Sequence, residues 1–126
     1  MTLVLDSGGV SALAGQRARL AELRRRGLWP PQVPAVVLTE ALTGDHRRDF
    51  HPNRLLSTCQ VRPVTEELAR TGARLRGAHP MPGSIAATDA IVAALAISHT
   101  DAIVLTSDPR DLAALLVDEN VSVVAV

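Results

Sequence analysis

Short apolar, β-branched runs alternate along this chain with segments that have a helical pattern. The apolar runs predict strands at Thr2–Leu5, Val33–Leu38, within Leu55–Val64, at Ala102–Leu105 and at Val121–Val126. The segments between them predict helices at Val10–Arg26, Thr39–Thr43, Thr65–Arg76, Ser84–His99 and Pro109–Leu116. This alternation is typical of α/β folds, in which a mainly parallel sheet carries helices on both faces. In such sheets, ligands bind beyond the carboxyl ends of the strands.

Length and composition favour a single domain over residues 1–126. Hydrophobic residues make up 47% of the chain, which excludes a disordered polar protein. The lone Cys59 cannot form an intramolecular disulfide, and its apolar neighbours indicate a packing role. Because the chain shows no signal-peptide pattern and no apolar run near the roughly 20 residues of a membrane span, we expect a cytoplasmic protein without membrane contact.

Acidic residues follow three of the predicted strands. Asp6 comes directly after the first strand, Glu40 lies just past the second, and Asp108 follows the fourth. Each has a simpler explanation, because Asp6 and Asp108 are good helix caps and Glu40 is favoured near a helix N-terminus. Asp111 would fall in the first turn of the helix after Asp108. Taken singly, Asp108 is better explained as a cap than as a ligand.

Asp89 is harder to explain structurally. It lies in a predicted helix, Ile85–Ile97, that is apolar on nearly every face and is therefore expected to be mostly buried. A buried carboxylate costs several kcal/mol unless it is paired, neutralised or bound to a cation. A buried Asp–Arg pair and a metal site are the two interpretations.

Together, these carboxylates point to a metal. Asp6, Glu40, Asp89 and Asp108 can converge at one edge of a parallel sheet, and the chain has no Lys to neutralise them. A hard divalent cation with oxygen ligands, Mg²⁺ or Mn²⁺, would offset their repulsion. A site of this kind suits phosphodiester hydrolysis by a metal-activated water.

The same residues resemble the PIN-domain ribonucleases, and in particular the VapC-type toxins of bacterial toxin–antitoxin modules. The resemblance spans essentially the whole chain and rests on four segments. They are Leu3-Val4-Leu5-Asp6-Ser7, Leu38-Thr39-Glu40-Ala41, Ala87-Thr88-Asp89-Ala90-Ile91 and Leu105-Thr106-Ser107-Asp108-Pro109-Arg110-Asp111.

The resemblance implies a three-layer α/β/α sandwich and a Mg²⁺- or Mn²⁺-dependent endoribonuclease. It also implies a homodimer inhibited by a small VapB-like antitoxin. Asp6, Glu40 and Asp89 take three acidic positions of the family motif, and Asp108 takes the fourth, with Asp111 in reserve. Metal ligation is expected from Asp6, Asp89 and Asp108. Three hydroxyls would support the carboxylates or a water, namely those of Ser7, Thr106 and Ser107.

Gly8-Gly9 departs from the family pattern, in which many relatives have a second small polar residue at this place. The departure removes one hydroxyl near the site. The glycines would instead allow the backbone to approach a phosphate. Metal affinity and catalytic strength are therefore the properties that this departure affects.

RNA contacts would have to come from arginine, since the formal net charge is zero and only Trp29 and Phe50 are aromatic. The candidates are Arg17, Arg24, Arg25, Arg47 and Arg48, with Arg19, Arg26 and Arg54 beside them. A solvated helix face explains any one of them equally well. Asp45–Asn53 is predicted to be an exposed polar segment that carries His46 and His51 on the surface.

Three other functions can be weighed against a nuclease. A receiver domain needs a Lys, which this chain lacks, and Gly8-Gly9 does not extend to the G-x-G-x-x-G of dinucleotide-binding domains. The stronger alternative is a catalytically weak PIN fold that binds RNA or a protein. Metal dependence of RNA cleavage would separate this binding module from the nuclease.

Overall fold

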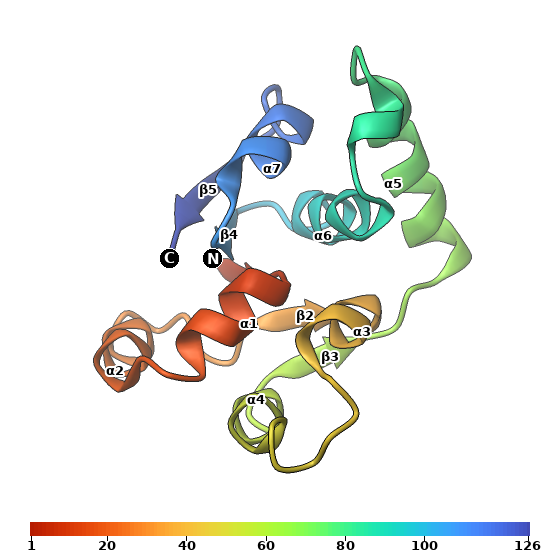
Figure 1. The fold of residues 1–126 in the computed structure, drawn as a ribbon. Helices are drawn as coiled ribbons and strands as arrows, with labels where there is room; N and C mark the ends of the chain where they lie inside the picture. Colours follow the sequence, from red (N-terminus) through yellow and green to blue (C-terminus); the bar gives the residue numbers. More distant parts are fainter.

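The computed structural model describes all 126 residues and contains one sheet of five parallel strands. In sheet order the strands are β3 (Gln60–Arg62), β2 (Gln32–Pro34), β1 (Thr2–Leu5), β4 (Ala102–Thr106) and β5 (Val121–Ala125) (Figure 1). At the centre, Leu5 of β1 lies opposite Leu105 of β4, and Val4 lies opposite Gln32 of β2. The predicted parallel α/β sheet is confirmed.

The strand order creates a switch point between β1 and β4. From β1 the chain moves outward to β2 and β3, and then returns to the other side of β1 to form β4 and β5. The connections after β1 and β4 therefore lead away in opposite directions. The crevice that this leaves at the carboxyl ends of the two strands is where open α/β sheets bind ligands.

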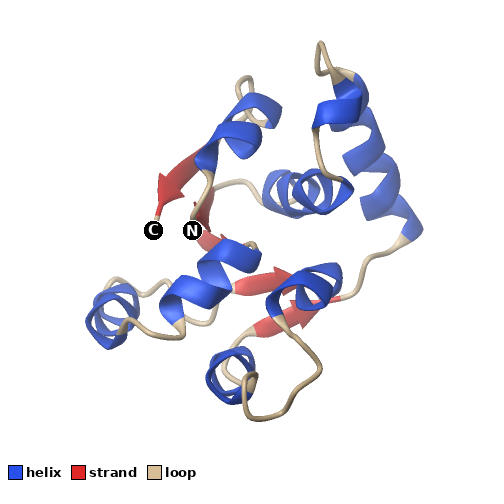
Figure 2. Ribbon diagram, viewed as in Figure 1, coloured by secondary structure: helices blue, strands red, loops and turns tan.

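Helices cover both faces of the sheet, as predicted. Figures 1 and 2 show one group on one side, formed by α1 (Ser7–Leu13), α2 (Arg17–Arg25) and α4 (Phe50–Leu56). The other side carries α5 (Glu66–Gly77), α6 (Ala87–Ile97) and α7 (Pro109–Leu115). The short helix α3 (Leu38–Ala41) follows the 3-10 turn η1 (Ala35–Val37), and a second such turn, η2 (Pro82–Ser84), precedes α6. The three-layer sandwich is confirmed.

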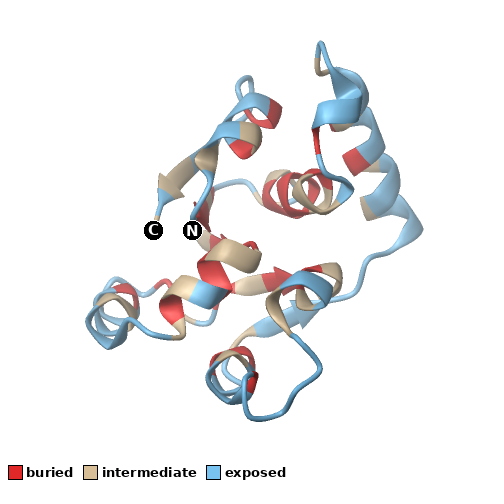
Figure 3. Ribbon diagram, viewed as in Figure 1, coloured by how far each residue is buried: buried red, intermediate tan, exposed pale blue.

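The core lies on both sides of β1 and β4. Leu3, Leu5 and Leu105 are almost fully buried, and α6 buries every residue from Val92 to Ala96 (Figure 3). Edge strand β3 is exposed at all three positions, in agreement with the limit that Pro63 sets on it. No helix is both long and apolar enough to cross a bilayer.

Two predicted elements were wrong in extent. The helix predicted over Val10–Arg26 is two helices, because the chain turns at Gly15, and the break lets Leu13 and Leu23 both reach the core. The strand predicted over Val33–Leu38 ends at Pro34, where the chain enters η1. Pro34 has no N–H to donate to a longer ladder.

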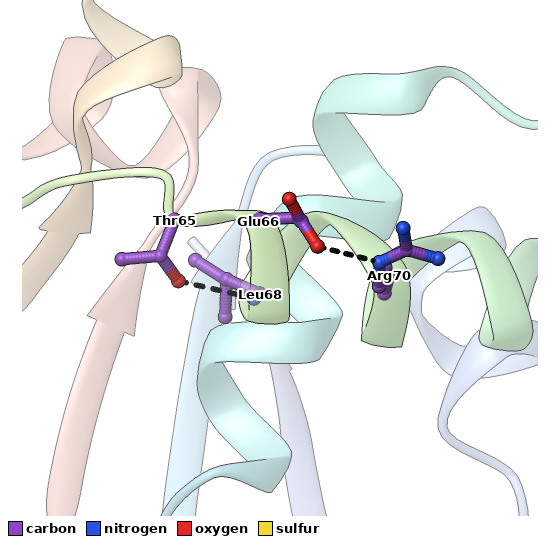
Figure 4. Close-up of polar contacts among 4 residues, drawn as sticks. All are labelled: Thr65, Glu66, Leu68 and Arg70. Carbon is purple, nitrogen blue, oxygen red and sulfur yellow. Dashed lines mark hydrogen bonds and ion pairs between the residues drawn. The ribbon is translucent and has the colours of Figure 1, made fainter.

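The start of α5 agrees with the sequence. The Leu68 backbone N–H donates to Thr65 Oγ1 at 3.1 Å, so Thr65 is the helix cap. One turn further, Glu66 and Arg70 form an exposed ion pair with 2.9 Å between Oε2 and Nε (Figure 4). Pairs this exposed add little to stability. It is the chain's one ion pair, so twelve of the thirteen arginines have no acidic partner.

Candidate active site

Asp6 joins β1 to α1 at the switch point. Its Oδ1 accepts a hydrogen bond from the Gly9 backbone N–H at 2.7 Å, so Asp6 does cap α1. Its Oδ2 accepts a hydrogen bond from the Thr106 hydroxyl, at the end of β4. Asp6 is buried, yet each oxygen has a single protein partner and keeps a lone pair for a further ligand. Capping and ligand binding are therefore compatible at this residue.

Gly8 and Gly9 have a packing role at this junction. A Cβ on Gly8 would lie 2.0 Å from Ser107 Oγ, and a Cβ on Gly9 would lie 2.4 Å from the Leu105 carbonyl oxygen. Only glycine permits α1 to lie this close to the end of β4. Ser7, the first residue of α1, is half-buried beside them. The departure from the family pattern thus has a structural cause, independent of any phosphate.

Asp108 and Asp111 lie where β4 leads into α7. The Asp108 backbone N–H donates to Thr106 Oγ1 at 3.1 Å, so one hydroxyl links Asp6 to the turn after β4. Asp108 occupies the cap position of α7, but its carboxylate makes no capping hydrogen bond. The interpretation of Asp108 as a simple cap is therefore wrong. Its carboxylate is exposed, whereas Asp111, in the first turn of α7, is half-buried.

Asp89 lies in the first turn of α6 and is half-buried. Burial is the main cause that raises the pKa of its carboxyl to about 6. The charges of Asp6, Asp111, Glu40 and Asp108 raise this pKa further, in that order. Among these charges, that of Asp111 affects the pKa of Asp89 more than that of Asp108 does. Which of the two takes the fourth acidic position stays a prediction.

No cation of the protein neutralises this acidic cluster, which we define as Asp6, Glu40, Asp89, Asp108 and Asp111. The only ion pair of the chain is on α5, so the alternative of a buried Asp–Arg pair at Asp89 is wrong. Glu40 is exposed in the four-residue helix α3. The five residues come from four separate parts of the chain, since Asp108 and Asp111 both belong to the start of α7, and their charges act on Asp89 in the first turn of α6.

The donor set fits a hard divalent cation. As they are placed, no three Asp, Glu, His or Cys side chains converge closely enough to ligate one ion directly. Mg²⁺ typically takes only one or two carboxylates and keeps several waters, so a looser arrangement of acids agrees with its chemistry. Asp89, whose ionised form is disfavoured by its neighbours, is the residue that a cation would relieve most. The predicted ligand set of Asp6, Asp89 and Asp108 stays a prediction.

Several residues outside the cluster can also be placed. Burial raises the pKa of the Cys59 thiol to about 11, and its Sγ donates to the Leu55 carbonyl, so it is a neutral packing residue. His46 and His51 are exposed, as expected. Asp49 contradicts the prediction of an exposed polar segment, because it is buried. The five predicted RNA contacts are exposed and unpaired, namely Arg17, Arg24, Arg25, Arg47 and Arg48.

The profile of the PIN domain matches residues 16–115. The chain belongs to the PIN-domain family. The match includes Glu40, Asp89, Asp108 and Asp111 of this PIN domain, whereas Asp6 lies before it. The position of Asp6 in the site is therefore given by its hydrogen bond with Thr106 and not by the family profile.

Three solved structures share the fold of this PIN domain along nearly the whole chain. One is DNA-bound VapBC from Salmonella typhimurium, with a TM-score of 0.72, 16% identity and coverage of 99% of this chain and 98% of that one. FitAcB from Neisseria gonorrhoeae has a TM-score of 0.65 and 22% identity, with 96% of each chain covered. A toxin–antitoxin complex from Klebsiella pneumoniae has a TM-score of 0.66 and 20% identity, with 95% of each chain covered. No curated protein matches the sequence.

Proposed function

We propose that this PIN domain is a metal-dependent endoribonuclease and the toxin of a toxin–antitoxin pair. One observation carries the proposal: four acidic residues lie around the half-buried Asp89 without a cationic partner, and burial together with their charges raises the pKa of Asp89. Mutually repelling carboxylates are costly to keep unless a bound cation uses them. Membership of the PIN family and the fold shared with toxin–antitoxin complexes support this interpretation.

The chain's own residues would prepare the site before any substrate arrives. Asp6, Asp89 and Asp108 would hold Mg²⁺ or Mn²⁺, and Glu40 and Asp111 would complete the negative charge around it. When bound, such an ion supplies an activated water and stabilises negative charge on the phosphate. The Gly9 N–H and the Thr106 hydroxyl fix the orientation of Asp6 from two sides.

No side chain is needed as a nucleophile. The Cys59 thiol stays neutral at physiological pH, because burial raises its pKa to about 11. Attack by water opposite the leaving 3′ oxygen would leave a 5′-phosphate and a 3′-hydroxyl. End-group analysis of the RNA products checks this polarity.

The decisive experiment measures RNA cleavage against metal. Wild-type protein should cleave RNA with Mn²⁺ or Mg²⁺ and stop when EDTA is added. Asp89→Asn should lose about 100-fold or more of the activity, while Asp118→Asn, an exposed acid after α7, should keep it. Full activity in a folded Asp89→Asn variant, or cleavage that EDTA does not affect, would refute the mechanism.

A second candidate is a PIN fold that binds RNA or a protein without efficient cleavage. It is favoured by the observation that no three ligands converge on one point. Binding of this kind would be indifferent to Mn²⁺ and to EDTA, so the same titration separates the two functions.

The proposed partner is a small antitoxin, and the proposed assembly is a homodimer. Support comes from the similar structures, of which one is DNA-bound VapBC and another is a toxin–antitoxin complex. A short neighbouring open reading frame whose product forms a complex with this chain and stops RNA cleavage is the expected finding. Light scattering of the purified chain tests the dimer.

A further inference from the structure

A groove between α2 and α4 lies on the opposite end of α1 from Asp6. Its volume is about 760 Å³, and its lining includes Ala14 and Gly15, directly after α1. Figure 1 shows α2 and α4 on the same side of the sheet, with α1 between them and the sheet's centre. The seven residues of α1 rise by about 10 Å, so the groove begins only a few nucleotides away from the acidic cluster.

The groove is basic. Arg17, Arg24 and Arg54 line it, with His51 beside them, and no acidic residue contributes to the lining. None of the three arginines forms an ion pair. The region from residue 17 to residue 54 contains eight of the thirteen arginines and only four acidic residues. The zero net charge therefore conceals a basic region beside an acidic site.

The chain's only two Phe, Tyr or Trp residues are both next to this groove. Trp29 Nε1 donates to Thr58 Oγ1 at 3.1 Å, and the Arg24 guanidinium lies 5.4 Å from the Trp29 ring centroid. Phe50 is 55% exposed, and its ring meets that of His51 edge-on at 5.2 Å. Arg24, Thr58 and His51 all line the groove. Both aromatic side chains therefore contact residues that line one basic groove.

We propose that this groove binds single-stranded RNA next to the cleavage site. Arg17, Arg24 and Arg54 contact phosphates, and the exposed Phe50 ring stacks with a base. An acidic protein segment would meet the same charges, but the exposed Phe50 ring beside unpaired guanidinium groups favours a polyanion that also has π-faces. The cleavage role of this RNA rests on the proposed function, whereas its binding does not.

Binding is measured by fluorescence anisotropy in EDTA, on the Asp89→Asn background, so that no cleavage interferes. The probe is a labelled, unstructured RNA of about twelve nucleotides, within the range of known single-strand sites. The groove variant is Arg17→Gln/Arg24→Gln/Arg54→Gln. The control variant removes three charges elsewhere: Arg62→Gln/Arg70→Gln/Arg74→Gln, whose side chains are exposed and lie outside the groove lining.

The groove variant should bind RNA about tenfold or more weakly, with a salt dependence of log K shallower by about two, because each lost phosphate contact removes about 0.7. Phe50→Ala should weaken binding about fivefold or more without changing the salt slope. The control variant, with the same loss of charge, should change affinity by less than the groove variant does. Equal losses in the groove variant and the control variant would overturn the proposal.

Cleavage provides an independent readout in the wild-type background. The groove variant should show a raised KM for the same RNA and an unchanged kcat. A small diester, bis(p-nitrophenyl) phosphate, is too short to reach the groove and should be hydrolysed at the wild-type rate. If the chain cleaves nothing, the proposed function fails, while the anisotropy result still decides the groove. If a Glu- and Leu-rich helical peptide binds the groove more tightly than RNA does, the groove belongs to a protein partner and the proposal is wrong.

Discussion

Two regions of this PIN domain each hold a buried aspartate that accepts a hydrogen bond from a threonine hydroxyl, Asp49 from Thr43 and Asp6 from Thr106. The surroundings shift the pKa of a carboxyl in opposite directions in the two regions, downward for Asp49 and upward for Asp89, which lies near Asp6. In the loop between α3 and α4, Asp49 Oδ1 accepts from the Thr43 N–H and hydroxyl at 2.8 and 2.9 Å, and Oδ2 accepts from the Gly44 N–H. The hydrogen bond from the Thr43 backbone is the main cause that lowers the pKa of Asp49. At the acidic cluster, burial and neighbouring charges raise the pKa of Asp89 instead.

The difference separates an acid whose charge is satisfied within the fold from one that we propose as a metal ligand. Asp49 has all its partners inside the loop, where Gly44 adopts a φ of 86° that favours glycine. Its charge holds the backbone and is not available to a ligand. Asp89 has only like charges around it, and Asp6 keeps free lone pairs, so a bound cation would lower the electrostatic cost of this region.

The largest difference should appear when the two threonine hydroxyls are removed in turn. Thr106→Val frees the carboxylate of Asp6 and should lower RNA cleavage or Mn²⁺ affinity by about 10- to 100-fold. Thr43→Val removes the matching hydroxyl at Asp49 and should leave cleavage per folded molecule unchanged. Single-turnover assays with Mn²⁺ titration measure both. Similar losses in the two variants would erase the distinction between the regions.

A Cβ added to a glycine should lower the unfolding free energy more beside the acidic cluster than at an open position elsewhere. Gly9→Ala places a Cβ against the Leu105 carbonyl oxygen, which cannot rotate away, and should cost about 1–3 kcal/mol of unfolding free energy. Gly77→Ala, at the end of α5 with no atom within 4 Å of the new Cβ, should be neutral or slightly stabilising. Urea denaturation compares the two, and an undisturbed Gly9→Ala protein would contradict the packing role.

Asp89→Asn should make the metal-free protein more stable at neutral pH. The folded-state pKa of about 6 lies above the ordinary aspartate pKa of 3.8, so the wild type loses stability as pH rises from about 4 through 6. Removing the charge should gain about 1–2 kcal/mol above pH 7, after allowance for solvent screening, and nothing below pH 4. Urea denaturation in EDTA at both pH values tests this, and a destabilised variant at pH 7 is the opposing result.

Asp49→Asn should destabilise the protein, whereas Asp89→Asn stabilises it, and the change in stability should be smaller. The amide presents N–H groups where Gly44 needs an acceptor, so the Tm at pH 7 should fall by several degrees. Because the folded pKa of Asp49 is lowered, its contribution is present above pH 4 and is lost as pH falls through that lowered pKa. The difference between wild type and variant should therefore shrink at pH 3. Thermal melts at the two pH values provide the check.

The hydrophobic periodicity and the acidic residues at strand ends could be recognised from the sequence alone. The alternating pattern predicted the parallel sheet, and Thr65 marked the start of α5. The acids after β1 and β4, together with Asp89, were recognisable because local sequence already assigns them to strand ends and to an apolar helix. The hydrophobic pattern failed at Gly15 and Pro34, because it continues past both residues although the helix and the strand end there.

The burial of Asp49 was not predictable, since its partners come from a loop conformation that no short-range pattern describes. The need for glycine at positions 8 and 9 was not predictable either, because the atoms that leave no room for a Cβ belong to Leu105 and Ser107, almost a hundred residues away. The basic groove was equally hidden, because it needs Arg17 and Arg24 from one helix and Arg54 from another.

The amino-acid sequence by itself determined the α/β class and which carboxylates stand at strand ends, because both depend on neighbours within a few residues. Only the tertiary structure decided which acids face one another and which are satisfied by hydrogen bonds. It also decided which arginines share a groove. Charge interactions and desolvation depend on distance in space, and that distance is set by how the helices pack on the sheet.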